Sequence, residues 1–234
     1  MKTSNKILVI SSSTLMGIVI VFLLLFRLTL GNSITTEEGK ESGNPTVFRE
    51  LPLEGFTAIE VSGHWEIDLA HGEMTQVKVE APGDVMERLS VEKQAGTLIL
   101  KTDKNWRPDP GKVTALITMP SLSDIRVSGL VSLKLNNFSS ENLTIHTKGS
   151  TSITGKGNHF HDLHLNGEGL SNLNLRQNSV INADLRYKGV YKIELSMAGG
   201  ELTGQIKGVG KVIYNGEVRK ENIRKDGPCK VIRE

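Results

Sequence analysis

Cysteine, aromatic residues and an excess of charge are scarce in this sequence, and each scarcity excludes a class of protein. Cys229 is the one cysteine in 234 residues, so no intrachain disulfide can form. Lysine and arginine number 28 against 26 acidic residues, a net charge of +2. This balance argues against a dedicated nucleic-acid-binding protein, which usually carries a marked basic excess. Aromatic residues make up 5% of the chain whereas glycine occurs 24 times, which suits a repetitive β structure better than a large irregular core.

The longest apolar run lies at the amino terminus. Residues 7–26 carry no charge, and twenty helical residues span about 30 Å, the thickness of the hydrocarbon core of a bilayer. Lys2 and Lys6 precede the run, whereas acidic side chains accompany the basic ones after it, which favours a cytoplasmic N-terminus. We therefore predict a transmembrane anchor within residues 1–30, a flexible linker over 31–47 and an extracytoplasmic domain over 48–234. A cleaved signal peptide is the alternative, although its apolar region usually has about 7–15 residues.

A repeat of about 20 residues runs through the second half of the chain. Its anchors are glycines at spacings of 20, 20, 20, 19 and 19 residues: Gly129, Gly149, Gly169, Gly189, Gly208 and Gly227. Gly63 takes the same place in "IEVSGHWEIDL", residues 59–69, which matches "IRVSGLVSLKL" at 125–135. Apolar and polar residues alternate on both sides of each glycine, the period of a strand with one buried face. The pattern predicts an all-β solenoid, a parallel β-helix with a glycine corner in each repeat and two or three strands per turn.

Other columns of the repeat carry polar residues. Asn142, Asp162, Asn182 and Glu201 lie seven residues before their glycines. Asparagine and aspartate suit turns, so we predict a turn ladder there; a calcium site would need more converging carboxylates. Two outward columns contain, respectively, His146, Asn166, Arg186 and Gln205, and Ser132, Ser152, Asn172, Lys192 and Lys211. Neither column is an acidic cluster.

Several motifs occur in an order typical of one bacterial family. They are "FTAIEVSG" at 56–63, "GTLILKT" at 96–102, "MPSLSDIRVSG" at 119–129 and "GKVIYNG" at 210–216. With the glycine repeats between them, they resemble the DUF2807 family of adhesin head GIN domains over residues 48–234, and the opening "MKTSNK" before the apolar run is similar to Bacteroidetes members of that family. The resemblance implies that the β-helix is right-handed, that the protein lies in the cell envelope or on the surface, and that no family catalytic residues can be transferred to this chain.

Two classes of function are compatible with such a fold: a non-enzymatic binding, adhesion or scaffold module, and a polysaccharide-active lyase or hydrolase. A glycosidase needs two carboxylates on either side of the scissile bond, and no such pair converges in the columns. His159, His161, Asp162 and His164 are residue types that bind zinc, but they fall in a turn that does not aim them at one point, so we predict a solvated turn. We therefore expect no enzyme activity, no metal and no cofactor.

The predicted module would bind through exposed side chains. Trp65 and Trp106 are the two tryptophans, and an exposed indole can stack on a sugar ring, so they are the candidate glycan contacts; burial in the core is the alternative for both. Cys229 is expected to be a small buried residue rather than a nucleophile. The predicted partners are the membrane, through the N-terminal helix, and a glycan, an envelope protein or a second copy of the chain.

Overall fold

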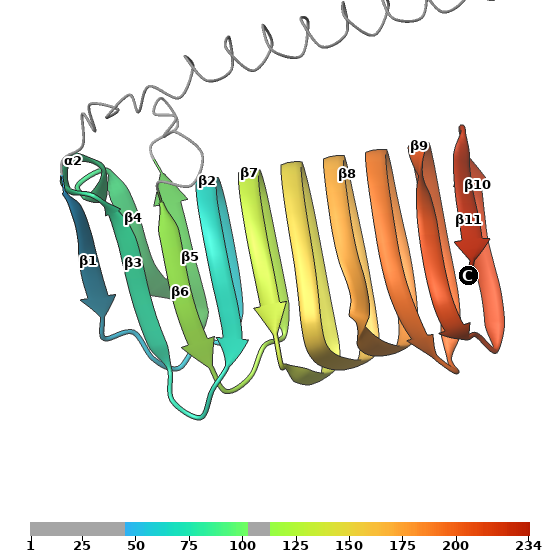
Figure 1. Cartoon of the computed structure of the whole chain (residues 1–234), viewed down its shortest axis with the longest axis horizontal. Helices are drawn as coiled ribbons and strands as arrows, with labels where there is room; N and C mark the ends of the chain where they lie inside the picture. Colours follow the sequence, from blue (N-terminus) through green and yellow to red (C-terminus); the bar gives the residue numbers. More distant parts are fainter. Residues whose placement is uncertain (1–44, 103–112) are drawn as a thin grey trace, which may run out of the picture. The chain divides into compact units, whose positions relative to one another are not determined.

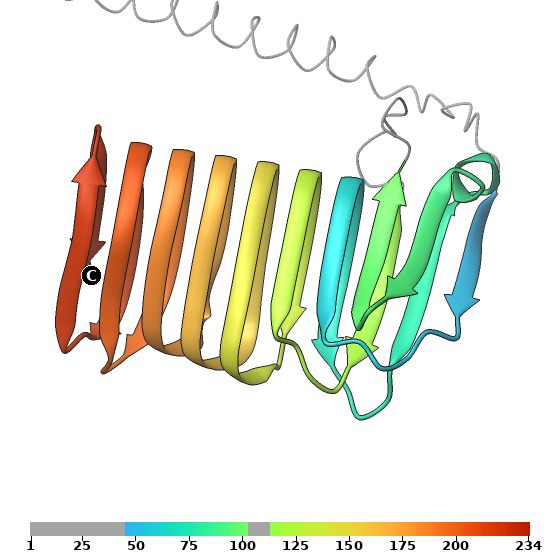
Figure 2. The same ribbon diagram turned by 180° about the vertical axis from the view of Figure 1, so that it is seen from behind.

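A computed structural model describes residues 45–102 and 113–234, which form one eleven-stranded sheet (Figure 1). The strands are β1 (Thr46–Leu51), β2 (Ala58–His71), β3 (Gln76–Pro82), β4 (Leu89–Gln94), β5 (Thr97–Thr102), β6 (Thr114–Met119), β7 (Asp124–Asn136), β8 (Ser139–Ala198), β9 (Glu201–Glu217), β10 (Lys220–Asp226) and β11 (Cys229–Arg233). One short helix, α2 (Gly83–Met86), follows β3. Seen from behind, the strands again lie side by side in the order β1-β3-β6-β2-β7-β8-β9-β10 (Figure 2).

The predicted fold class, a right-handed parallel β-helix, is wrong because the sheet is mixed rather than a closed solenoid. Strands β1 and β3, β3 and β6, and β4 and β5 pair antiparallel. Strand β2 pairs parallel with β5, β6 and β7, and all pairs among β7 to β11 are parallel. Short connections explain part of the difference. Ala95 and Gly96 join β4 to β5 with φ of 44° and 78°, the positive values of a two-residue hairpin turn, and such a connection makes the strands antiparallel.

The predicted transmembrane helix cannot be placed on this structure. Residues 1–30, and all but the last three of the predicted linker, lie outside the described residues. Among the residues described, no helix is long and apolar enough to cross a membrane.

The 20-residue spacing of the glycines is the pairing register of the parallel strands. Gly63 pairs with Gly129, Gly129 with Gly149, and Gly189 with Gly208. Strand β8 continues through three such repeats without a break, and a Cβ on Gly189 would meet the backbone of Gly169. The seven corner glycines have φ between +99° and +129°: Gly63, Gly129, Gly149, Gly169, Gly189, Gly208 and Gly227. At six of these corners a side chain would strike the backbone of the preceding corner glycine, whereas at Gly63 it would strike Thr102.

The hydrophobic core lies between the two limbs of these repeats. Alternate residues of each limb point inward, so that Ile125, Ile145, Leu165 and Leu185 are fully buried in one column. The whole buried cluster falls between Phe56 and Cys229. The compact unit Asn44–Glu234 thus contains its own core, and we expect this fragment to fold independently.

A pair of buried asparagines closes the core at the end opposite the glycine corners. Asn158 accepts a hydrogen bond from the backbone N–H of Phe138 at 2.8 Å and donates to the Leu135 carbonyl at 2.7 Å. Asn178, twenty residues later, accepts from the Asn158 amide at 2.6 Å and donates to the Gly155 carbonyl at 2.9 Å. The ladder satisfies backbone groups that the turns leave unpaired inside the protein.

Candidate functional site

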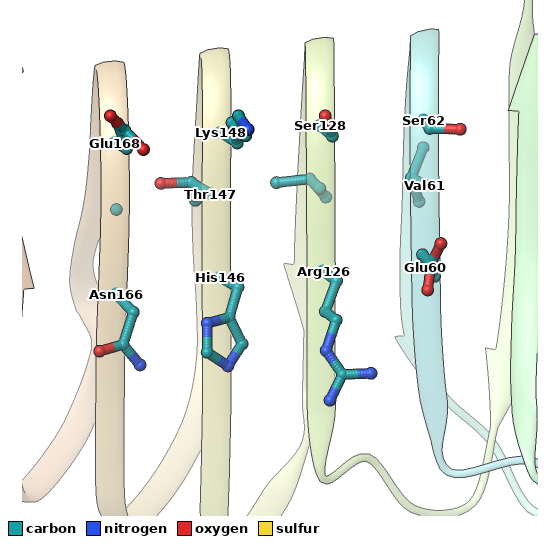
Figure 3. Close-up of a pocket in the computed structure, with 12 residues that line it drawn as sticks. Glu60, Val61, Ser62, Arg126, Ser128, His146, Thr147, Lys148, Asn166 and Glu168 are labelled. Atoms are coloured by element: carbon teal, nitrogen blue, oxygen red, sulfur yellow. The ribbon is translucent and has the colours of Figure 1, made fainter.

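A groove of about 480 Å³ crosses the outward side of strands β2, β7 and β8 (Figure 3). Two parallel rows of side chains line it and continue past it. The arginine row comprises Glu60, Arg126, His146, Asn166, Arg186 and Gln205; the lysine row comprises Ser62, Ser128, Lys148, Glu168, Lys188 and Lys207. Figure 3 shows the first four members of each row, with those of the lysine row beside the bend of each repeat and those of the arginine row further from it. Because paired strands lie about 4.8 Å apart, each row repeats at that interval.

The groove extends into a second hollow of about 590 Å³ along the same two rows. Gly167 lines both hollows, and the second adds Arg186 and Lys188 from β8 and Gln205 and Lys207 from β9. The two hollows together follow six consecutive strand passes. They form a long open surface suited to an extended ligand rather than a compact one.

Basic side chains outnumber acidic ones among the residues that line this surface, and Asp124 and Asp226, just outside the lining, pair with Arg126 at 3.1 Å and Lys207 at 2.8 Å. Together the two hollows are lined by five lysines and arginines, Arg126, Lys148, Arg186, Lys188 and Lys207, and by three carboxylates, Glu60, Glu168 and Asp184. Several cations are paired, as when Arg186 lies 3.2 Å from Asp184 and Lys188 lies 3.8 Å from Glu168. These pairs are exposed, and exposed pairs contribute about 0–1 kcal/mol, so an anionic ligand can compete for the cations.

The floor of the groove is supported by a buried tyrosine. Gly167 lacks a side chain, and the ring of Tyr187 occupies the space that a Cβ there would need. The Tyr187 hydroxyl lies 3.2 Å from Oγ1 of Thr147, which in turn lies 3.2 Å from Oγ of Ser171. Burial raises the pKa of Tyr187 to about 12. The phenol is therefore protonated at neutral pH and acts as a structural support.

The carboxylates of the groove do not form a hydrolytic pair. Glu60 and Glu168 lie on strand passes that are three apart, which places them about 14 Å apart or more. Retaining and inverting glycosidases need separations of about 5–5.5 Å and 6.5–9.5 Å, respectively. Glu60 and Glu168 therefore cannot flank one glycosidic bond.

Trp65, the tryptophan within the described residues, does not form a sugar-binding surface. Trp65 is 1% exposed, and its indole N–H donates to the Ser62 carbonyl at 3.2 Å. The prediction that Trp65 contacts a glycan is therefore wrong, because it follows Gly63 at an inward position and packs in the core. Trp106 lies outside the described residues. The sequence pattern did indicate this burial, because Trp65 falls on the same alternate positions of the strand as the buried Ile67 and Leu69.

The histidine-rich segment that was predicted to be a turn lies within strand β8, and its histidines form pairs with carboxylates. His161 Nδ1 lies 3.0 Å from Oδ2 of Asp162, and His164 Nδ1 lies 3.9 Å from Oδ2 of Asp184. In the two described ranges, no three histidine, cysteine, aspartate or glutamate side chains converge closely enough to hold a metal ion. Asn182 donates to Asp162 at 2.9 Å and is the main cause of the lowered pKa of that carboxyl. Asn182 also accepts from the Glu201 N–H at 2.9 Å, so this column includes a turn ladder.

The family comparison fits a binding protein of this kind. The model of DUF2807, described as "Putative auto-transporter adhesin, head GIN domain", matches residues 55–190, more than half of the chain, and the protein belongs to this family. The resemblance predicted from the sequence is confirmed.

Two of three solved structures similar to the chain are described as putative adhesins and the third as a putative lipid binding protein. A putative adhesin from Bacteroides fragilis is 18% identical, with 82% of this chain and 98% of that chain covered and a TM-score of 0.64. A putative adhesin from Parabacteroides merdae is 15% identical over 82% and 98% of the two chains, with a TM-score of 0.43. A putative lipid binding protein from Parabacteroides distasonis is 12% identical over 81% and 97%, with a TM-score of 0.47. No curated protein matches the sequence.

The first of these structures shows that the fold is shared. The adhesin-like family supports a non-enzymatic role and a location in the cell envelope or outside the cell.

Proposed function

We propose that this protein is a non-enzymatic adhesion module of the cell envelope that binds an extended anionic glycan along its groove. The observation that carries the proposal is the pair of rows, which present five cationic side chains against two carboxylates over six strand passes. An extended polymer can contact several positions of a row at once. The individual contacts are weak, but contacts made along one chain act together.

The chemistry of the rows favours an acidic polymer over a neutral one. Arginine forms bidentate hydrogen bonds with carboxylate, sulfate or phosphate groups, and the arginine row supplies two such side chains, Arg126 and Arg186. Lys148 adds a cation that has no ion-pair partner among the described residues. His146 and Asn166, between the two arginines, can donate to hydroxyl groups of the same chain.

Glycan-array binding of the fragment Asn44–Glu234 tests the proposal. We expect binding to acidic glycans that weakens as salt rises, because exposed charge interactions are screened. The double variant Arg126→Gln/Arg186→Gln should weaken this binding by about tenfold or more, which corresponds to about 1.4 kcal/mol. The matched control is Arg49→Gln/Arg88→Gln, which removes the same charge from exposed positions away from the groove.

The outcomes separate the proposal from its competitors. Failure to bind any acidic glycan would exclude the proposed ligand class. Equal loss of binding in the groove variant and the control would show that net charge alone, and not the rows, is responsible.

A further inference from the structure

A line of exposed apolar side chains follows the glycine corners. The residue after each corner glycine points outward, and in five successive repeats these residues form what we call the corner ridge: Leu130, Ser150, Leu170, Val190 and Val209. The four apolar members are between 48% and 55% exposed. Nine large apolar residues are exposed in the described part of the chain, and four of them fall at this one position of the repeat.

The fold does not require apolar residues on the corner ridge. The next residue of each repeat, such as Val131 or Tyr191, already points inward and is buried. Ser150 occupies the same position between Leu130 and Leu170, so a polar side chain is compatible with the bend. An exposed apolar line that packing does not explain is typical of an interaction surface.

Lysines flank the corner ridge on both sides. The residues immediately before the glycines and three after them provide ten flanking positions along the five repeats. Five are lysine, Lys148, Lys188, Lys207, Lys192 and Lys211, and one is a carboxylate, Glu168. The lysine stems can lie along apolar surface while their ammonium groups reach outward.

We propose that the corner ridge is a membrane-contact surface that rests on an anionic phospholipid bilayer. Its apolar side chains would enter the interface, and the flanking lysines would bind the phosphate headgroups, the arrangement found on amphipathic interfacial elements. The ridge spans four strand spacings, about 19 Å, on a rigid sheet, so its side chains can enter the interface together. Contact with a second copy through the same ridge is disfavoured, because it would place the two sets of lysines against each other.

This surface is distinct from the glycan site proposed above. The arginine row lies further from the bend and takes no part in the ridge (Figure 3). Lys192 and Lys211 lie beyond the corner and line neither hollow of the groove. The lysine row belongs to both surfaces, so experiments that separate them must use the ridge residues and the arginine row.

Vesicle co-sedimentation of the fragment Asn44–Glu234 tests the inference. The vesicles contain phosphatidylcholine alone or equal parts of phosphatidylcholine and phosphatidylglycerol. We expect the fragment to partition onto the anionic vesicles at least about tenfold more strongly, with an affinity that falls as salt rises. Leu170→Ser/Val190→Ser, which copies the natural Ser150, should reduce that partitioning by about tenfold or more. Met74→Ser is the matched control, because Met74 is 73% exposed and lies off the ridge.

Circular dichroism first establishes that each variant is folded. Failure of the fragment to bind anionic vesicles, or equal binding by the ridge variant, would overturn the inference. A dimer in sedimentation velocity that the ridge variant abolishes would overturn it in favour of self-association. Loss of vesicle binding in Arg126→Gln/Arg186→Gln, with binding by the ridge variant intact, would assign the headgroups to the groove instead. If the ridge variant still binds glycans, the function proposed above holds whether or not the ridge binds vesicles.

Discussion

Replacing one corner glycine should reveal how tightly the repeats are stacked. Gly169 has φ of +110°, and a Cβ built on it would strike the carbonyl oxygen of Gly149 in the preceding repeat. Gly169→Ala therefore combines a backbone conformation that L-residues avoid with a clash against backbone, which cannot rotate away as a side chain can.

The magnitude of the effect follows from its two parts. A non-glycine residue held in a sparsely populated region of φ and ψ costs about 1–3 kcal/mol. Forcing an extra carbon into a packed site costs about 1–3 kcal/mol more. The total, about 2–6 kcal/mol, is a large share of the 5–15 kcal/mol by which domains are usually stable.

Urea unfolding of the fragment Asn44–Glu234, followed by circular dichroism, measures this free energy. Gly199→Ala is the matched control, because Gly199 also has positive φ, +95°, yet no atom lies within 4 Å of the Cβ position. We expect the control to lose about 1–3 kcal/mol from strain alone. A Gly169→Ala variant no less stable than the control would refute the argument that the preceding backbone leaves no room for a side chain.

Three further predictions concern buried and charged groups. Asn158→Ala should cost about 1–3 kcal/mol for each of the two backbone groups it leaves unpaired, measured by urea unfolding. Lys192 and Arg176 lower the pKa of the Glu194 carboxyl, so their contribution to stability is present above the unfolded pKa and is lost as pH falls through the lower folded value; Arg176→Gln should shrink the acid dependence of the unfolding midpoint. The pKa of Tyr187 is raised by burial to about 12, so its contribution is complete below its unfolded pKa of about 10 and is lost as pH rises through 12; ultraviolet titration should show one phenolate step fewer in that range in Tyr187→Phe.

The parallel half of the sheet could be predicted from the sequence because its pattern is repeated. Alternation at period two identified inward columns such as Ile125 and Ile145, and both are fully buried. The glycine spacing matched the register of strand pairing. The antiparallel part has no such period, so its pairing depends on short turns, and a sequence-wide extension of the repeat led to the wrong fold class.

The candidate site could be predicted from the sequence only in part. The outward column of His146, Asn166 and Arg186 could be read from the repeat, but the groove that these side chains line also depends on the neighbouring lysine row and on Gly167 above the ring of Tyr187. The Tyr187 ring packs where Gly167, twenty residues earlier, has no side chain, and no local sequence pattern reveals this contact. Likewise, the asparagine ladder of Asn158 and Asn178 resembled ordinary turn residues in sequence.

The position of the first of the two shortened repeats indicates which part of the repeat holds the surface rows in register. The pairing offset is 19 residues from Ala183 onward, whereas the preceding repeats are offset by 20. The missing residue falls at the turn near Gly199 and Gly200, at the end opposite the glycine corners, and not within a strand limb. A one-residue change within a limb would send every following outward side chain inward. Because the change is confined to the turn, Lys188 still pairs with Lys207 and Val190 with Val209, so the lysine row and the corner ridge pass unbroken into the shorter repeat.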